Sequence, residues 1–222
     1  MRKKVLILFM LFCIGITFFG CGSSTKTLVE DNLSEVTKVY YLGENENFYC
    51  TLSSGEREEI YLVNGTSTKK TPFALLSIVP TNAISKNLIK ATISIDGIAS
   101  EVELEINGLN HNFMVDLEKE LSGKEIIEVT FENSTLTLEN LSNGFGVNYE
   151  KALEIASNEM EEKILEKKSY KNLNSEFYLR ILDKKANQFD EIFWGFTILN
   201  IDGESYSIVF STEDGSVLAK SN

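Results

Sequence analysis

The sequence predicts a mainly β protein in which an N-terminal β-sandwich is followed by a small α+β domain. Two observations support this fold class. Up to residue 142 the chain alternates apolar and polar residues in short segments, with turn residues about every eight to twelve positions, as is typical of a β-sandwich. From residue 147 the apolar period changes from about 2 to about 3.6, which indicates an amphipathic helix, and further strands follow it.

The first residues have the three-part pattern of a secretory signal. Three basic residues open the chain, residues 5–19 form an almost unbroken apolar run, and Gly20 precedes Cys21. The apolar run is too short and wrongly flanked for a stable transmembrane helix. The junction around Cys21 resembles the bacterial lipoprotein signal, in which a small residue precedes a cysteine that becomes lipidated. It departs from that motif at Phe18, where leucine is usual.

The resemblance implies that residues 1–20 are removed and that Cys21 carries lipid. A diacylglyceryl cysteine brings two acyl chains, which are enough for stable anchoring. The expected location is therefore the extracytoplasmic face of the bacterial cell membrane. Residues 21–35 are polar and aperiodic and are predicted to be a flexible tether. The β-sandwich then spans residues 36–142 and the α+β domain spans residues 147–222.

The charge of the chain limits its partners. The formal net charge is −12, and loss of the three basic residues of the signal changes it to −15. Nucleic acids and anionic lipid headgroups would repel a protein of this charge. We therefore expect no nucleic-acid partner, whereas a basic protein is a compatible one.

The β-sandwich is predicted from a series of short segments that are rich in Val, Ile, Phe, Tyr and Thr. These segments are residues 36–42, 46–53, 58–63, 72–79, 88–96, 101–107, 111–118, 125–132 and 134–139. In the second segment, Phe48, Cys50 and Leu52 fall on one side, so Cys50 is interpreted as a core residue. Cys13 leaves with the signal and Cys21 carries lipid, so no intramolecular disulfide is expected.

The helix is predicted to begin after Asn148, a suitable N-cap. Its apolar stripe consists of Tyr149, Ala152, Leu153, Ala156, Met160 and Ile164. Strands are predicted at 176–183, 192–201 and 205–211, and Asp202-Gly203 is predicted to join the last two as a two-residue hairpin turn.

This order of elements resembles the PepSY domain over about residues 147–222. The resemblance rests on the helix that opens with Tyr149, the strand pair, and an acidic turn before Val217. Residues 212–215 read Thr-Glu-Asp-Gly where the family has an acidic-x-x-Thr-Gly turn. PepSY domains occur in the propeptides of thermolysin-like metallopeptidases and in bacterial envelope proteins. The resemblance implies an inhibitory, chaperoning or regulatory interaction module.

The chain carries few residues suited to catalysis. His111 is its single histidine, which excludes the usual zinc sites with two imidazoles, and a solvated position near a turn is the simpler interpretation. The sequence has no phosphate-binding loop, dinucleotide fingerprint or calcium-loop spacing. We therefore expect no catalytic residues, no bound metal and no cofactor.

The last hairpin supplies the candidate binding residues. A two-residue turn would pair Leu199 with Tyr206 on the face that the helix covers. The other face would carry Trp194, Phe196, Ile198 and Val209. One helix covers only one face, so these four residues are predicted to contact the β-domain, another helix or a partner.

The leading hypothesis is a non-enzymatic envelope lipoprotein that binds an envelope protein, such as an extracellular peptidase or cell-wall hydrolase that it restrains. The alternative is a ligand-binding or sensory lipoprotein that recognises wall glycan or a small molecule. A third hypothesis is a hydrolase that uses paired carboxylates.

Overall fold

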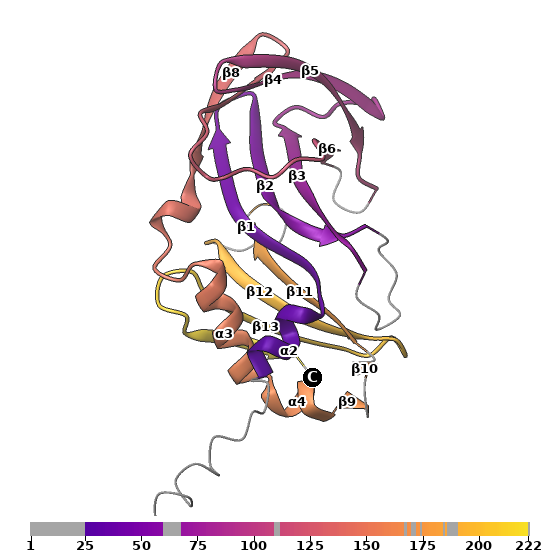
Figure 1. Ribbon diagram of the computed structural model, residues 1–222. Helices are drawn as coiled ribbons and strands as arrows, with labels where there is room; N and C mark the ends of the chain where they lie inside the picture. The colour runs from indigo at the N-terminus through magenta and orange to yellow at the C-terminus, as the bar shows by residue number, and fades with distance from the viewer. Residues whose placement is uncertain are drawn as a thin grey trace, which may run out of the picture.

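The structure is a computed structural model that describes residues 25–59, 68–108, 112–166, 168–169, 172–173, 175–183, 185 and 191–221. Within these ranges twelve strands form one continuous sheet (Figure 1). Their order is β14-β13-β12-β11-β1-β2-β3-β6-β5-β4-β7-β8, and an additional pairing of β1 with β8 closes part of the sheet on itself.

Eight of these strands form a closed, antiparallel barrel. They are β1 (Leu33–Glu44), β2 (Phe48–Glu58), β3 (Lys70–Pro80), β4 (Leu88–Ile95), β5 (Ile98–Ile106), β6 (Phe113–Asp116), β7 (Ile127–Phe131) and β8 (Ser134–Asn140). The ring closes where Tyr41 and Leu42 of β1 pair with Asn140 and Glu139 of β8.

Apolar side chains fill the interior of the barrel. The buried residues of this barrel core include Tyr41, Phe48, Cys50, Leu52, Leu76, Ile78, Ile93, Leu104, Ile127 and Val129. The prediction that Cys50 is a core residue is confirmed, because its side chain has no solvent exposure. Burial also raises the pKa of the Cys50 thiol well above its ordinary value.

The prediction of a β-sandwich is wrong, because the strands close into a barrel. Alternation along each strand shows which residues face inward, and it is the same in a sandwich and in a barrel. The two folds differ in whether the first and last strands pair. That pairing joins residues about a hundred positions apart, so no local pattern reveals it.

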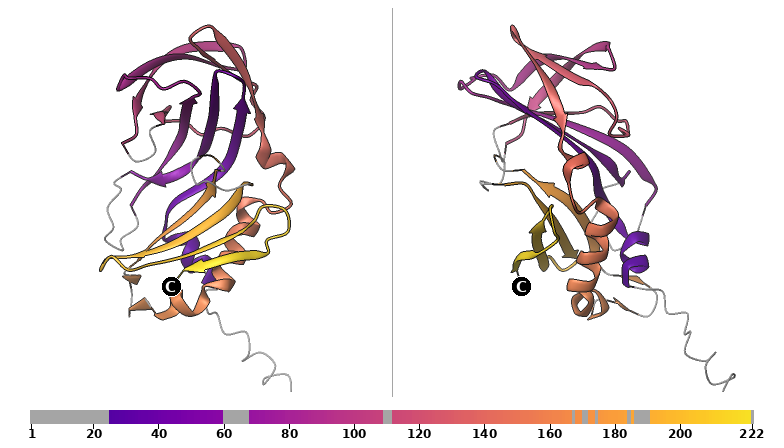
Figure 2. Two further views of the ribbon diagram at one scale, coloured as in Figure 1. Left: turned by 180° about the vertical axis from the view of Figure 1, so that it is seen from behind. Right: turned by 90° about the vertical axis from the view of Figure 1, so that its left-hand side faces the viewer.

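The C-terminal part adds helices and strands beside the barrel. These elements are η1 (Leu141–Gly144), α3 (Tyr149–Glu159), α4 (Glu161–Glu166), β9 (Lys168–Ser169), β10 (Asn172–Leu173), β11 (Ser175–Leu182), β12 (Phe193–Asn200), β13 (Ser205–Ser211) and β14 (Val217–Ser221). An N-terminal helix, α2 (Thr25–Asp31), packs against α3 and α4. Figure 2 shows the helices on one side of the C-terminal strands.

Strand β1 belongs to both parts of the molecule. Its first half pairs in parallel with β11, with Leu33 opposite Phe177 and Val36 opposite Leu179. The hydroxyl of Ser34 on β1 donates a hydrogen bond to the carboxylate of Glu176 on β11, and both side chains are buried. The four C-terminal strands are therefore an extension of the barrel sheet.

A β-bulge bends β1 where it passes from one part to the other. Thr37 pairs with Gly55 and Val39 with Ser54, so β1 has one extra residue at this point. A Cβ atom on Gly55 would lie 1.9 Å from the carbonyl oxygen of Val36. Only glycine allows β2 to follow the bulge so closely.

The C-terminal strands and the three helices enclose a second hydrophobic core. The predicted apolar stripe of α3 and α4 forms part of this core, and its residues Leu153, Ala156 and Ile164 are buried. The predicted N-cap is confirmed, since the Asn148 side chain accepts a hydrogen bond of 3.0 Å from the backbone N–H of Lys151. Val29 of α2 and the first half of β1 complete this core.

The prediction of a separate α+β PepSY-like domain following a sandwich is therefore wrong as a fold class. Residues 147–222 do not close their own core, since α2 and β1 supply part of it. The predicted tether also differs from the structure, because residues 25–31 form α2 and β1 begins at Leu33. Leu28 and Val29 pack against the second core, and two apolar residues are too few to predict a helix from a short polar segment.

The last hairpin has a longer turn than predicted. The backbone N–H of Asn200 donates to the carbonyl of Glu204, and that of Gly203 donates to the carbonyl of Asn200. Three residues, Ile201 to Gly203, thus form the loop, and Gly203 has a φ of 89°. The predicted pairing of Leu199 with Tyr206 is wrong, because Ile198 pairs with Tyr206. A slip of one residue moves side chains to the opposite face.

We predict that a fragment of residues 147–222 does not fold alone. It would expose the apolar surface that α2 and β1 cover, and burial of each large side chain contributes about 1.5–3 kcal/mol. Circular dichroism and the fluorescence of Trp194 test this, with the mature chain as the control. A fragment with native-like helix content and a blue-shifted Trp194 emission would contradict the shared core.

Candidate functional site

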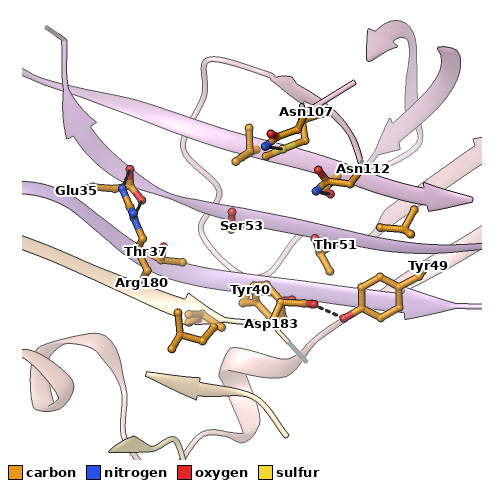
Figure 3. A pocket seen from close by; sticks show the side chains of 16 residues that line it. Glu35, Thr37, Tyr40, Tyr49, Thr51, Ser53, Asn107, Asn112, Arg180 and Asp183 are labelled. Atoms are coloured by element: carbon orange, nitrogen blue, oxygen red, sulfur yellow. Dashed lines mark hydrogen bonds and ion pairs between the residues drawn. The ribbon is translucent and has the colours of Figure 1, made fainter. Parts of the chain in front are cut away.

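A groove of about 500 Å³ lies on the outer surface of the barrel (Figure 3). Its wall consists of outward-facing residues of β1, β2, β3 and β6, together with the end of β11. The groove exists because β11 pairs with only the first half of β1 and its end lies beside the outer face of the barrel. The barrel interior is filled, so this outer surface is the candidate site.

The wall of the groove is polar but uncharged in its middle. Thr51 and Ser53 of β2 and Ser77 of β3 point outward and alternate with core residues such as Leu52 and Leu76. Hydroxyl groups both donate and accept hydrogen bonds. The middle of the groove therefore offers neutral hydrogen-bonding groups.

The outer face of the barrel at β4 and β5 differs from the groove in carrying charged side chains. Glu101, Glu103 and Glu105 of β5 are exposed, and Lys90 of β4 lies 3.0 Å and 3.2 Å from the carboxylates of Glu101 and Glu103. This face has the charged side chains expected of a solvated sheet. The neutral polar wall of the groove is thus a local feature and not a property of every outward face.

Asp183 closes one end of the groove. The hydroxyls of Tyr40 and Tyr49 both donate to its carboxylate, and the backbone N–H of Lys185 donates at 2.7 Å (Figure 3). Burial, together with the negative charge of Asp183, raises the pKa of both tyrosines well above the ordinary value. Asp183 thus fastens the end of β11 to β1 and β2.

An ion pair closes the other end. Nε and Nη2 of Arg180 lie 2.6 Å and 3.1 Å from the two carboxylate oxygens of Glu35. This bidentate pair joins β11 to β1. The charged groups of the groove are therefore engaged with protein partners.

The inner wall contains a pair of buried polar side chains. Nδ2 of Asn112 donates a hydrogen bond of 2.7 Å to Oγ of Ser77, and these side chains are only 6% and 9% exposed. Apolar atoms of Leu75, Val79 and Met114 lie between the polar groups of the groove. The surface can therefore contact both the hydroxyls and the C–H faces of a small ligand.

The structure places the predicted binding residues elsewhere. Trp194, Phe196 and Ile198 are at most 1% exposed and lie in the second core, where Nε1 of Trp194 donates to the carbonyl of Val147 at 2.8 Å. The one-residue difference in register puts them on the helix-covered face. Val209 faces the other way and is half-buried. Of the three contacts predicted for this face, the structure shows packing inside the chain for Trp194, Phe196 and Ile198, which share a core with α2 and the first half of β1.

Two other residues considered in the sequence lie outside the described ranges. They are Cys21, the predicted lipidation site, and His111. Within the described ranges, no group of three or more His, Cys, Asp or Glu side chains is placed to hold a metal ion. Among the same residues, no helix has the length and apolar character needed to cross a bilayer.

The sequence reasoning missed the groove residues. The available signal was the contrast between the outward residues of two strands, which are Thr51 and Ser53 in β2 but glutamates in β5. The contribution of Asn112 and Asp183 depends on contacts between distant strands, and no local pattern marks them.

We predict that Asp183→Ala lowers the free energy of unfolding by about 1–3 kcal/mol, because two buried tyrosine hydroxyls lose their acceptor. Asp183→Asn keeps one acceptor oxygen and is expected to cost less. Urea unfolding at neutral pH measures both. The control is Asp31→Ala on the exposed end of α2, with an expected change within about 0.5 kcal/mol. Equal effects of the two alanine substitutions would contradict the fastening role.

Comparisons with known proteins find no similar one: no protein-family model, no curated protein and no solved structure matches the chain. The resemblances to the lipoprotein signal and to the PepSY sequence pattern therefore stay predictions from the residues alone.

Proposed function

We propose that this protein is a lipid-anchored, non-catalytic binding protein of the bacterial envelope, and that its outer groove holds a small, uncharged, hydroxyl-rich ligand such as a short oligosaccharide. The observation that carries the proposal is the neutral polar wall formed by Thr51, Ser53 and Ser77, which contrasts with the charged outward residues of β5 on the same barrel.

The chemistry of the wall supports a sugar-like ligand. Each sugar hydroxyl can donate and accept, as can the hydroxyls of Thr51, Ser53 and Ser77. The apolar atoms of Leu75 and Val79 can contact the C–H face of a sugar ring. A cavity of about 500 Å³ is within the usual range for small-ligand sites.

The electrostatics of the groove favour a neutral ligand. A carboxylate or phosphate would have to separate Arg180 from Glu35, and it would approach an acidic protein. A cationic ligand would have to compete with the two tyrosine hydroxyls for Asp183. Both processes would break existing hydrogen bonds and desolvate the charged group of the ligand, so both lower the affinity for a charged ligand.

The lipid anchor is proposed at Cys21, just before α2. Figure 1 shows α2 at the end of the molecule opposite β4, β5 and β8. An anchor there would hold the helical end near the membrane and the barrel away from it, which leaves the groove accessible to envelope components. The hypothesis of a restrained peptidase rests on the PepSY resemblance, and Trp194, which could have contacted such a partner, lies in the core.

We predict that Cys21→Ala abolishes fatty-acid labelling and leaves an unprocessed precursor, because the sulfur that accepts the lipid is missing. Metabolic labelling followed by electrophoresis of the envelope fraction measures this. Substitution of the neighbouring Ser23→Ala is the matched control and should be processed normally. Equal labelling of the Cys21 variant and the wild type would disprove the anchor.

We predict that the mature chain binds cellotriose or chitotriose and that Thr51→Val weakens binding about fivefold, the equivalent of one lost hydrogen bond. Isothermal titration calorimetry measures the affinity. Thr92→Val is the matched control, since Thr92 is an exposed, outward-facing threonine of β4 on the charged face. If the wild type binds neither trisaccharide, the proposed ligand class is wrong. Equal loss in both variants would mean that binding occurs outside the groove.

A further inference from the structure

One polar atom in the groove has no partner in the described part of the chain. Asn112 is 6% exposed, and its Oδ1 accepts no hydrogen bond, although its Nδ2 donates to Ser77. The residue stands directly before β6, and the neighbouring Phe113 pairs with Ile78 of β3. Asn112 lines the groove, and its buried Oδ1 lies within the groove wall (Figure 3).

None of the residues that the structure describes donates to this acceptor. The backbone carbonyl of Asn112 accepts a separate hydrogen bond of 2.7 Å from the N–H of Asn107. A buried acceptor without a partner destabilises a protein, and nearly all such groups in folded proteins are paired. A binding site is a place where a ligand supplies the missing donor.

Ser77 supplies a hydrogen-bond donor beside this unpaired acceptor. Its Oγ accepts from Asn112, which leaves the hydroxyl proton available for another group. The pair thus presents one acceptor, Oδ1 of Asn112, and one donor, the hydroxyl of Ser77, on the same wall. A ligand hydroxyl can satisfy both at once, whereas a carboxylate can only accept and an ammonium group can only donate.

We infer that Asn112 and Ser77 are the specificity-determining pair of the groove and that they bind a hydroxyl group of the ligand. This inference rests on the proposed function and deepens it. The ligand hydroxyl donates to Oδ1 of Asn112 and accepts from Ser77. Sites that hydrogen-bond a substrate hydroxyl reject analogues that lack it, because the buried groups of the protein are then left unpaired.

The test compares two substitutions at position 112 in the mature chain. Asn112→Leu removes the acceptor, and Asn112→Asp keeps an acceptor oxygen at the same place while the Ser77 hydroxyl turns to donate to the other oxygen. The probe is whichever of cellotriose and chitotriose the wild type binds more tightly. Calorimetry gives the affinity, and urea unfolding without sugar gives the stability.

Asn112→Leu is expected to weaken binding about tenfold, while the urea midpoint of the free protein changes little, because removal of the unpaired acceptor offsets loss of the hydrogen bond to Ser77. Asn112→Asp keeps the acceptor but takes the Ser77 hydroxyl proton from the ligand, so it is expected to weaken binding about as much as Ser77→Ala. Ser77→Ala, which removes the donor, is expected to weaken binding about as much as Asn112→Leu.

Four results would overturn the inference. If Asn112→Leu binds as the wild type does, the pair does not contact the ligand, although the proposed function stands. If Ser77→Ala and Asn112→Asp both bind as the wild type does, the Ser77 hydroxyl does not donate to the ligand and the two residues do not act as a pair. If affinity and stability fall together in Asn112→Leu, the role is structural. A wild type that binds neither sugar refutes both this inference and the proposed function.

Discussion

The structure depends on the sharing of strand β1 between two hydrophobic cores. Its first half pairs in parallel with β11, and its second half pairs with β2 and β8 to close the barrel. The bulge after Thr37 bends the strand between the two, and Gly55 permits the close approach of β2. Because β11 stays with the first half of β1, its end comes to lie beside the outer face of the barrel, and the groove forms there.

The sequence predicted local structure better than long-range structure. The helix after Asn148 and the burial of Cys50 follow from patterns within a few residues, and both are confirmed. Barrel closure and the pairing of β1 with β11 join distant segments, so periodicity could not reveal them. The prediction of the register of the last hairpin was wrong for a different reason. Both a two-residue and a three-residue loop accommodate glycine at position 203, but they differ by one residue in register.

That single difference in register changed the candidate site. With the predicted turn, Trp194 would have faced the β-domain, another helix or a partner. In the structure it lies in the second core, and its Nε1 donates to the carbonyl of Val147. The groove was accessible to sequence reasoning only in part. The neutral outward residues of β2 could be noticed, but the unpaired oxygen of Asn112 and the acceptor role of Asp183 arise from contacts between strands. The charge and the periodicity of a segment show which of its residues face outward. They do not show which strands lie side by side, and the groove depends on that.

Hydrogen–deuterium exchange of the mature chain with and without a bound trisaccharide tests most directly that the groove is the binding surface. Ligands slow exchange where they stabilise or cover the backbone. The account predicts slower exchange in peptides that cover β2, β3, residues 112–116 and the end of β11, and unchanged exchange in β4 and β5. Slower exchange confined to β4 and β5, or to the C-terminal strands β13 and β14, would contradict it.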